Sequence, residues 1–231
     1  TGGSRPIHLY LWTPHTGTNT GTMLANTTDT HTYFGVPFVG DINGDKRVEI
    51  VTLGSNGIYQ TQKGFRARRY NENSNTFDLL WDMNHMDQSG ATGMTLFDFN
   101  NDSISEIVYR DESYLRIINA SGKSHMTGLD TLQYYVIDSF ISYSETFYEY
   151  PVVADIYGNQ SSAILVTSDI RGPRPSGYAG NARIDIYTSD PSVPWAPARK
   201  VWNQYAYNAV NINEDLTTPR NPLNIATVFS G

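Results

Sequence analysis

The chain has 231 residues, a formal net charge of -7 at pH 7 and no cysteine. The acidic charge disfavours binding to the phosphate backbone of a nucleic acid, and the lack of cysteine excludes disulfides and thiolate metal sites. Charged residues make up 17% of the chain, which is too few for a disordered polyelectrolyte. No apolar run approaches the roughly 20 residues that span a bilayer, so we expect no membrane insertion.

The first predicted element is the segment RPIHLYLWT, which begins at Arg5. It is typical of a late strand in a repeat unit whose start is missing, so residues 1–32 are expected to form a partial unit. The beginning of the chain has no basic region followed by an apolar stretch, and it does not look like a signal peptide. If the protein is exported, we expect the signal to have been removed or to lie outside this chain.

The first complete unit is expected at residues 33–89. Short apolar runs separated by Gly, Asn and Asp predict four strands in it, namely Val36–Gly40, Glu49–Leu53, Ile58–Gln62 and Phe77–Trp81. A small basic cluster of three arginines precedes the last strand, and we expect it to lie on a solvated strand or loop: Arg66, Arg68 and Arg69. No stretch shows a sustained 3.6-residue period, so little helix is expected.

An acidic stretch marks the repeat. DINGDKRVEIV at Asp41 recurs as DFNNDSISEIV at Asp98 and, more weakly, as DIYGNQSSAIL at Asp155. Both offsets are 57 residues, which predicts further units at residues 90–146 and 147–207.

The third unit departs from this spacing after its second strand. Its next strand, RIDIYTS at Arg183, comes about 12 residues late because of the Gly- and Pro-rich insertion Arg171–Asn181. A loop of this length is either functional or a tolerated surface insertion. An eroded fourth copy, VNINEDLTTP, predicts that residues 208–231 start a further unit.

Four short strands in a unit of about 57 residues are typical of a β-propeller blade. A single blade cannot bury both faces, so neighbouring blades must stack. We therefore predict an all-β fold, a β-propeller or a segment of one, in a single domain over residues 1–231. An open arc would expose strand edges and apolar faces, so the chain is expected to be part of a longer protein or to pair with another copy or segment.

The acidic stretch also predicts a metal site. Oxygen-bearing side chains stand at positions 1, 3, 5 and 9 of each loop, and the backbone carbonyl at position 7 adds a ligand. The two candidate sets are Asp41, Asn43, Asp45, Arg47 and Glu49, and Asp98, Asn100, Asp102, Ile104 and Glu106. Such hard oxygen ligands suit Ca²⁺. The alternative is a hairpin turn rich in Asp and Asn that binds no metal.

Two further copies of this loop are expected to be empty. The third copy has Tyr157 and Asn159 at ligand positions and Ala163 in place of the closing Glu. The fourth has Pro219 at position 9. The loops are not EF-hands, because they lack the Gly at position 6 and the Glu at position 12.

DINGDKRVEIV and DFNNDSISEIV resemble the FG-GAP, or VCBS-type, repeat of integrin α subunits and many bacterial surface proteins. The resemblance covers about residues 33–205. It implies a propeller with one structural Ca²⁺ in each of the two complete loops, on a secreted or cell-surface protein. The tail ARKVWNQYAYNAVNINEDLTTP also looks like a segment of large secreted bacterial proteins with such repeats.

Motifs for catalysis are scarce. The chain has no G-x-S-x-G, H-E-x-x-H or P-loop motif. Asp82 and Asp87 could form a carboxylate pair for glycoside chemistry, and His85 is the imidazole best placed near a functional face. We expect a non-catalytic domain for adhesion or for recognition of a protein or glycan. The alternatives are a polysaccharide-degrading enzyme similar to a lyase, and a structural spacer in a larger surface protein.

Overall fold

The computed structural model describes residues 6–12, 22–32, 36–54, 64–83, 85, 87, 89–119, 136–144, 149–169, 182–203, 207 and 209–223. These residues form 13 strands in four antiparallel sheets, and none of them lies in a helix. The predicted all-β class is therefore confirmed. In the described part, no helix is long and apolar enough to cross a bilayer.

Sheet 1 contains the strands of the first complete unit in the order β3-β4-β5-β6. Its strands are β3 (Phe38–Gly40), β4 (Glu49–Leu53), β5 (Phe65–Asn71) and β6 (Thr76–Met83). The first, second and fourth predicted strands are confirmed. The predicted range Ile58–Gln62 lies outside the described residues, and β5 is the strand that pairs with β4.

The arginine cluster belongs to β5, so the prediction of a strand is right but that of a solvated cluster is wrong. Arg68 is only 7% exposed. Arg66 is also largely covered and forms an ion pair with Asp82, its partner across the strand pair. A cross-strand carboxylate explains how this strand can hold cationic residues within a packed sheet.

Sheet 2 and sheet 3 repeat this topology. Sheet 2 contains β7 (Met94–Phe97), β8 (Glu106–Arg110), β9 (Tyr114–Ile118) and β10 (Val136–Ile141). Sheet 3 contains β11 (Val152–Ala154), β12 (Ala163–Asp169) and β13 (Ala182–Thr188). A separate hairpin pairs β1 (Pro6–Trp12) with β2 (Met23–Thr32), so the first predicted segment is indeed a strand.

The 57-residue offset is a structural repeat. The second strands of the three sheets begin at Glu49, Glu106 and Ala163. Each of these residues pairs with the last residue of the preceding strand, in the same register.

The predicted delay in the third unit is also confirmed. Ile186 of β13 pairs with Leu165 as Ile117 of β9 pairs with Val108, and these two isoleucines are 69 residues apart, 12 more than the offset. The insertion Arg171–Asn181 itself lies outside the described residues.

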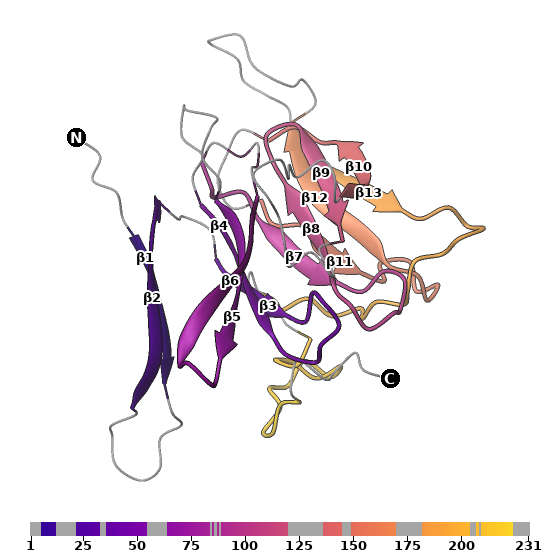
Figure 1. The fold of residues 1–231 in the computed structure, drawn as a ribbon. Helices are drawn as coiled ribbons and strands as arrows, with labels where there is room; N and C mark the ends of the chain where they lie inside the picture. Colours follow the sequence, from indigo (N-terminus) through magenta and orange to yellow (C-terminus); the bar gives the residue numbers. More distant parts are fainter. Residues whose placement is uncertain are drawn as a thin grey trace.

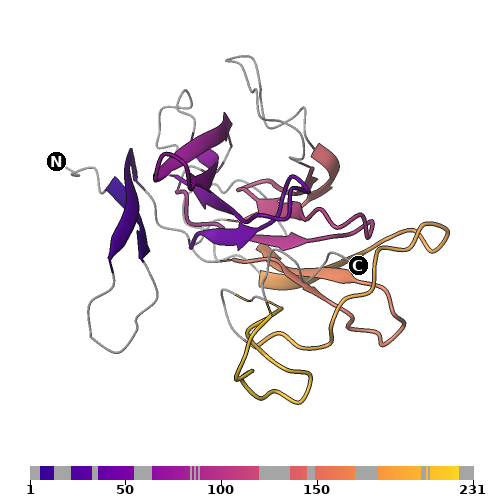
Figure 2. The same cartoon turned by 60° about the horizontal axis from the view of Figure 1, so that its bottom comes forward.

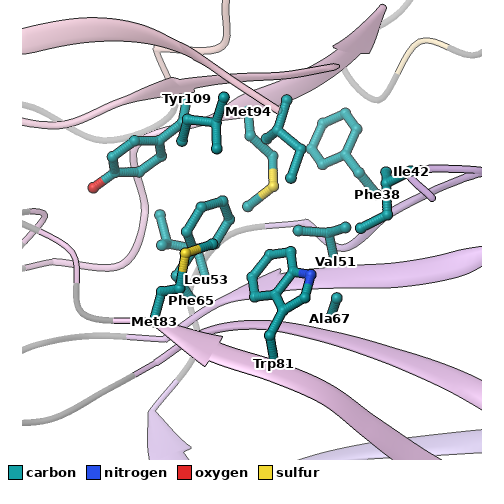
Figure 3. Packing of buried hydrophobic residues seen from close by; sticks show 12 residues of the cluster. Phe38, Ile42, Val51, Leu53, Phe65, Ala67, Trp81, Met83, Met94 and Tyr109 are labelled. Atoms are coloured by element: carbon teal, nitrogen blue, oxygen red, sulfur yellow. The ribbon is translucent and has the colours of Figure 1, made fainter. Parts of the chain in front are cut away.

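Sheets 1, 2 and 3 stack face to face. One apolar cluster joins sheet 1 to sheet 2 and includes Phe65 and Trp81 on one side and Met94 and Tyr109 on the other (Figure 3). A second cluster joins sheet 2 to sheet 3. Every residue of β8 is buried, because this strand supplies side chains to both clusters. Stacking therefore gives sheet 2 two covered faces, as expected for a repeat that cannot bury its surface alone.

The first strands of the three sheets lie along one side of the stack, with β7 contacting both β3 and β11. Figures 1 and 2 show the β1–β2 hairpin at the sheet 1 end and sheet 3 at the other. The described strands form separate stacked sheets and no closed ring. The predicted propeller is therefore not confirmed by this arrangement.

One face of sheet 3 is left exposed. We call it the open face and define it by Ile156, Ile184 and Ile186. The equivalent position of Ile184 is Leu115 in sheet 2 and Phe65 in sheet 1. Leu115 and Phe65 are 0% exposed, whereas Ile184 is 68% exposed. The open face thus carries the apolar pattern of an interface that has no neighbouring sheet in the described part.

Candidate calcium loops

Three loops join the first and second strands of sheets 1, 2 and 3. Loop 1 comprises residues 41–48, loop 2 residues 98–105 and loop 3 residues 155–162, and each starts with an Asp. The fourth and sixth residues of each loop have positive φ angles: Gly44 and Lys46, Asn101 and Ser103, and Gly158 and Gln160. Four of these six are not glycine, so the loop must supply compensating contacts for a conformation that L-residues rarely adopt.

The first Asp supplies such a contact in every loop. Its carboxylate accepts a hydrogen bond from the backbone N–H of the sixth residue, at 2.7 Å in loop 1, 2.8 Å in loop 2 and 3.3 Å in loop 3. Asp41, Asp98 and Asp155 therefore hold the turn in place through protein contacts alone. The interpretation as an Asp-rich turn accounts for this part of the motif.

The next oxygen ligands also contact the backbone of their own loop. Asn43 Oδ1 accepts from the N–H of Asp45 at 2.9 Å, and Asp45 Oδ1 accepts from the N–H of Arg47 at 2.9 Å. Loop 2 repeats both bonds through Asn100 and Asp102, at 3.0 and 2.8 Å. These local turns leave each carboxylate with lone pairs that can take a further partner.

The closing glutamates differ from the other ligands because they are buried. Glu49 and Glu106 are 0% and 1% exposed. Glu49 Oε2 accepts from the N–H of Ile42 at 3.1 Å, and Glu106 Oε2 accepts from the N–H of Phe99 at 2.9 Å. The second oxygen of each, Oε1, is buried and has no hydrogen-bond partner. A buried carboxylate oxygen without a partner costs free energy unless it is protonated or binds a cation.

The pKa values of the two glutamates also indicate that a charged carboxylate without a bound cation is unfavourable at these positions. Burial raises the pKa of Glu49 to about 7, and the nearby carboxylates Asp45 and Asp41 add to the rise. Burial also raises the pKa of Glu106 to about 7, again with a contribution from the two neighbouring aspartates of its loop. A site that disfavours a bare carboxylate beside other carboxylates favours a bound cation.

Loop 3 provides the comparison. Ala163 replaces the closing Glu and is buried, and Asp155 is the only carboxylate left of the frame. Among these three loops and their closing residues, a buried carboxylate oxygen without a partner thus occurs only where the acidic frame is complete, whereas the buried side-chain oxygen without a partner in loop 3 is the hydroxyl of Ser162. Hard oxygen donors of this kind fit Ca²⁺. The carboxylates as they stand are not drawn together, since no three acidic or imidazole groups in the described residues are grouped like the ligands of a metal ion.

The eroded fourth copy keeps part of the same loop structure. Its sixth residue, Leu216, has a positive φ of 67°, and Asp215 Oδ1 accepts from the N–H of Thr217 at 3.0 Å, as position 5 does for position 7 in loops 1 and 2. The predicted start of a further unit therefore has a counterpart in the backbone at residues 211–217.

The catalytic candidates from the sequence do not form one site. Asp82 pairs with Arg66, whereas Asp87 is fully buried and accepts hydrogen bonds from Ser89, Gly90 and Thr92 in its own loop. His85 is 2% exposed and lies edge-on to Tyr109. The two carboxylates therefore have separate structural roles, and the carboxylate-pair hypothesis gains no support from their contacts.

A cavity of about 240 Å³ lies where the first strands of the three sheets meet the C-terminal segment. Val39, Phe97 and Val153 line one side, and Trp202 and Tyr207, stacked with ring centroids 4.3 Å apart, line the other. Arg199 holds this segment in place, because its guanidinium donates to the carbonyls of Ala209 and Ile212 at 2.6 and 2.7 Å. Sequence reasoning missed this cavity, although the aromatic run after Arg199 was a usable signal.

These observations define an all-β protein of repeated, stacked antiparallel sheets with acidic loops at equivalent positions. A solved structure with a similar fold is that of the V. cholerae biofilm matrix protein Bap1, with a TM-score of 0.54 and 23% sequence identity. The match covers 79% of this chain and 26% of that chain, so the chain spans about a quarter of that protein. No family model and no curated protein matches the chain, so the FG-GAP resemblance stays a resemblance.

Proposed function

We propose that this chain is a calcium-stabilised repeat module of a secreted or cell-surface protein, with a role in adhesion or in recognition of a protein or glycan. The observation that carries the calcium proposal is the pair of buried oxygens, Glu49 Oε1 and Glu106 Oε1, that have no hydrogen-bond partner. Bound calcium would satisfy both. The ligands would be Asp41, Asn43, Asp45, the Arg47 carbonyl and Glu49 in loop 1, and Asp98, Asn100, Asp102, the Ile104 carbonyl and Glu106 in loop 2.

The role of such calcium is structural. Each loop connects the first and second strands of a sheet, and loops 1 and 2 also touch each other, because the N–H of Ser105 donates to the carbonyl of Asp41 at 3.0 Å. An ion that binds only the folded loops stabilises the fold by about 2.7 kcal/mol at 100 times its Kd. Extracellular modules commonly bind calcium at 10⁻⁴–10⁻³ M, which supports a location outside the cell.

The adhesion role rests on fold similarity and on surface chemistry. The similar structure is that of a biofilm matrix protein, and an extracellular matrix is a setting in which repeat modules bind polymers or partner proteins. The described residues around the cavity include one carboxylate, Asp41, and no histidine, so recognition is better supported there than acid–base catalysis. A glycan array probed with the calcium-loaded chain separates glycan recognition, which gives bound spots, from a pure spacer role, which gives none.

The open face supports a further part of the proposal, namely that the stack continues. Ile156, Ile184 and Ile186 occupy positions that the next sheet covers in units 1 and 2. We expect another sheet of the same kind to cover them, from a longer chain or from a partner segment. An array of this type, continued in the same direction, is the propeller or propeller segment that the sequence predicts.

Thermal unfolding tests the calcium proposal. The wild-type chain should unfold at a higher temperature in about 10 mM CaCl₂, which is roughly 10 times the weaker of the dissociation constants above, than after treatment with EGTA. Glu49→Gln and Glu106→Gln should each remove part of this difference, and the double variant nearly all of it. Glu72→Gln is the matched control, because Glu72 is an exposed carboxylate beside loop 1 that pairs with Arg47. An unchanged wild-type melting temperature contradicts the proposal.

A further inference from the structure

An arginine lies beside the calcium ligands of loop 1. Strand β5 pairs with β4 from Phe65 to Arg68, and it continues to Asn71 while paired with β6 alone. Arg69 is therefore the first residue of β5 beyond its paired segment with β4, and the register places it opposite Glu49, the residue that follows loop 1. Its guanidinium forms an ion pair with Asp45 Oδ2. About a third of each side chain is exposed, so the pair is only partly screened by water.

This ion pair leaves Asp45 with both carboxylate oxygens engaged. Oδ1 accepts from the backbone N–H of Arg47 at 2.9 Å, and Oδ2 binds Arg69. A calcium ion in loop 1 must therefore compete with a guanidinium for the position 5 carboxylate. The ion also brings a double positive charge close to a fixed positive charge, which raises its free energy in the site.

Loop 2 has a different arrangement at the same position. Asp102 Oδ1 accepts from the N–H of Ile104, and Oδ2 accepts from the neutral side-chain amide of Asn100 at 3.0 Å. The strand register makes Asn119 the equivalent of Arg69, since Ile118 pairs with Ile107 as Arg68 pairs with Ile50. In the part of the chain that the structure describes, Asp102 has no ion pair with an Arg or Lys. Among the residues that the structure describes, a calcium ion in loop 2 would displace a neutral amide from Asp102 and would meet no guanidinium paired with that carboxylate.

We infer that Arg69 is a built-in competitor for calcium that makes loop 1 the weaker of the two calcium sites, an inference that rests on the calcium binding proposed above. Loop 2 then fills first, and loop 1 fills only at higher calcium concentration. Since Ser105 of loop 2 is hydrogen-bonded to Asp41 of loop 1, the second step acts at the junction between sheets 1 and 2. One repeat module thereby responds to calcium over a wider range of concentration than two identical sites would.

Isothermal titration with CaCl₂ measures each site alone in single-site variants. Glu106→Gln removes a ligand of loop 2, so the remaining calcium binding reports on loop 1. Glu49→Gln removes a ligand of loop 1, so the remaining calcium binding reports on loop 2. The Kd of loop 1 should be roughly three- to tenfold higher than that of loop 2, as expected when a partly exposed ion pair must be broken and a like charge stays nearby. Adding Arg69→Gln to the Glu106→Gln variant should lower the Kd of loop 1 by a similar factor, whereas Arg69→Lys should lower it little.

The control is Arg183→Gln, which removes one positive charge from sheet 3, where Arg183 pairs with Asp185. It should leave both Kd values unchanged. Equal affinities of the two sites, with no effect of Arg69→Gln, overturn the inference while leaving calcium binding intact. Lack of calcium binding in the wild-type chain defeats the proposed function itself. If circular dichroism shows that Arg69→Gln does not fold, the test uses Asn119→Arg instead. This variant places an arginine beside loop 2 and should raise the Kd of loop 2 for calcium. An unchanged Kd of loop 2 overturns the inference.

Discussion

The second and third complete units, residues 90–146 and 147–207, have loops with the same backbone conformation. They differ in the residue that closes the loop and in the packing of their sheets. Loops 2 and 3 have positive φ angles at the same two positions, and in both the N–H of the sixth residue donates a hydrogen bond to the carboxylate of the first Asp. Loop 2 ends in the buried Glu106, whereas loop 3 ends in the buried Ala163. Loop 3 also keeps a hydrogen bond from the N–H of its seventh residue, Ser161, to the side chain of its fifth, Asn159. The comparison shows that the turn forms without the closing Glu. Such a residue is better explained by a ligand than by the fold.

The sheets of these units differ in a parallel way. Sheet 2 is covered on both faces, and sheet 3 on one. The repeated sequence supplies apolar side chains at the same positions in both, so the open face reflects the lack of a covering sheet among the described residues and not a change in the pattern. Three changes should break or sharpen the contrast between the two units.

The largest effect is expected at Leu115 and Ile184, which occupy equivalent strand positions in sheets 2 and 3. Leu115→Ala removes a fully buried side chain from the cluster between sheets 2 and 3, and it should lower the free energy of unfolding by about 2–5 kcal/mol. Ile184→Ala acts on a side chain that is 68% exposed, so it should change that free energy by less than about 0.5 kcal/mol. Urea unfolding of both variants measures the difference.

This pair of variants also tests whether the stack continues. In a longer chain that contains the next unit, Ile184→Ala should become as costly as Leu115→Ala, because the side chain is then covered. A cost that stays small in the longer chain contradicts the proposed continuation of the array across the open face.

The next effect is a dependence of stability on pH. Burial raises the pKa of Glu106 and Glu49 from 4.5 to about 7, so between these values the folded chain holds protons that the unfolded chain releases. The contribution of these groups to stability is full below pH 4.5 and is lost as the pH rises through 7. In calcium-free buffer the loss should be on the order of 1–3 kcal/mol per group.

Urea unfolding at pH 5 and at pH 7.5 measures this loss. Saturating calcium should abolish it, because the ion stabilises the deprotonated carboxylates. Glu106→Gln should halve the pH dependence in calcium-free buffer. Unit 3 has Ala163 at this position and contributes no such term. A calcium-free chain that gains stability between these two pH values would show that the glutamates are not the dominant groups.

The sequence predicts the repeat well because the acidic stretches recur at a constant offset that can be read directly from the residue numbers. Strands β4, β8 and β12 begin where the 57-residue offset places them, and the delay before β13 is visible as an insertion. The same offset fails for β5, because Ala67 pairs with Val51 whereas Ile117 pairs with Val108. Unit 1 thus has seven extra residues between its second and third strands. The inserted segment carries Gly54, Gly57 and Gly64, but it also contains the run Ile58–Gln62, which can itself form a strand, so alternation alone does not tell which run pairs with β4.

The candidate site was predictable in its residue types and not in its environment. The acidic frame identifies every proposed ligand, yet nothing local to Glu49 indicates that it is 0% exposed, or that Arg69 reaches Asp45. Both facts depend on strands that come together from different parts of a unit. Arg68 illustrates the same limit, since a charge-rich run suggests solvent whereas the packed sheet leaves this side chain 7% exposed.

The smallest effect concerns the first Asp of loops 2 and 3. Asp98 and Asp155 each accept two backbone hydrogen bonds within their own loop, so Asp98→Ala and Asp155→Ala should both cost about 1–2 kcal/mol in calcium-free buffer. Calcium should separate them: it should stabilise Asp155→Ala as much as the wild-type chain, and it should stabilise Asp98→Ala less, because loop 2 has lost a ligand. Urea unfolding of the wild-type chain and the two variants, each with CaCl₂ and with EGTA, gives the six values needed. If Asp155→Ala costs nothing, loop 3 does not rely on its Asp, and the shared turn in loops 1 and 2 then requires another cause, of which bound calcium is the first candidate.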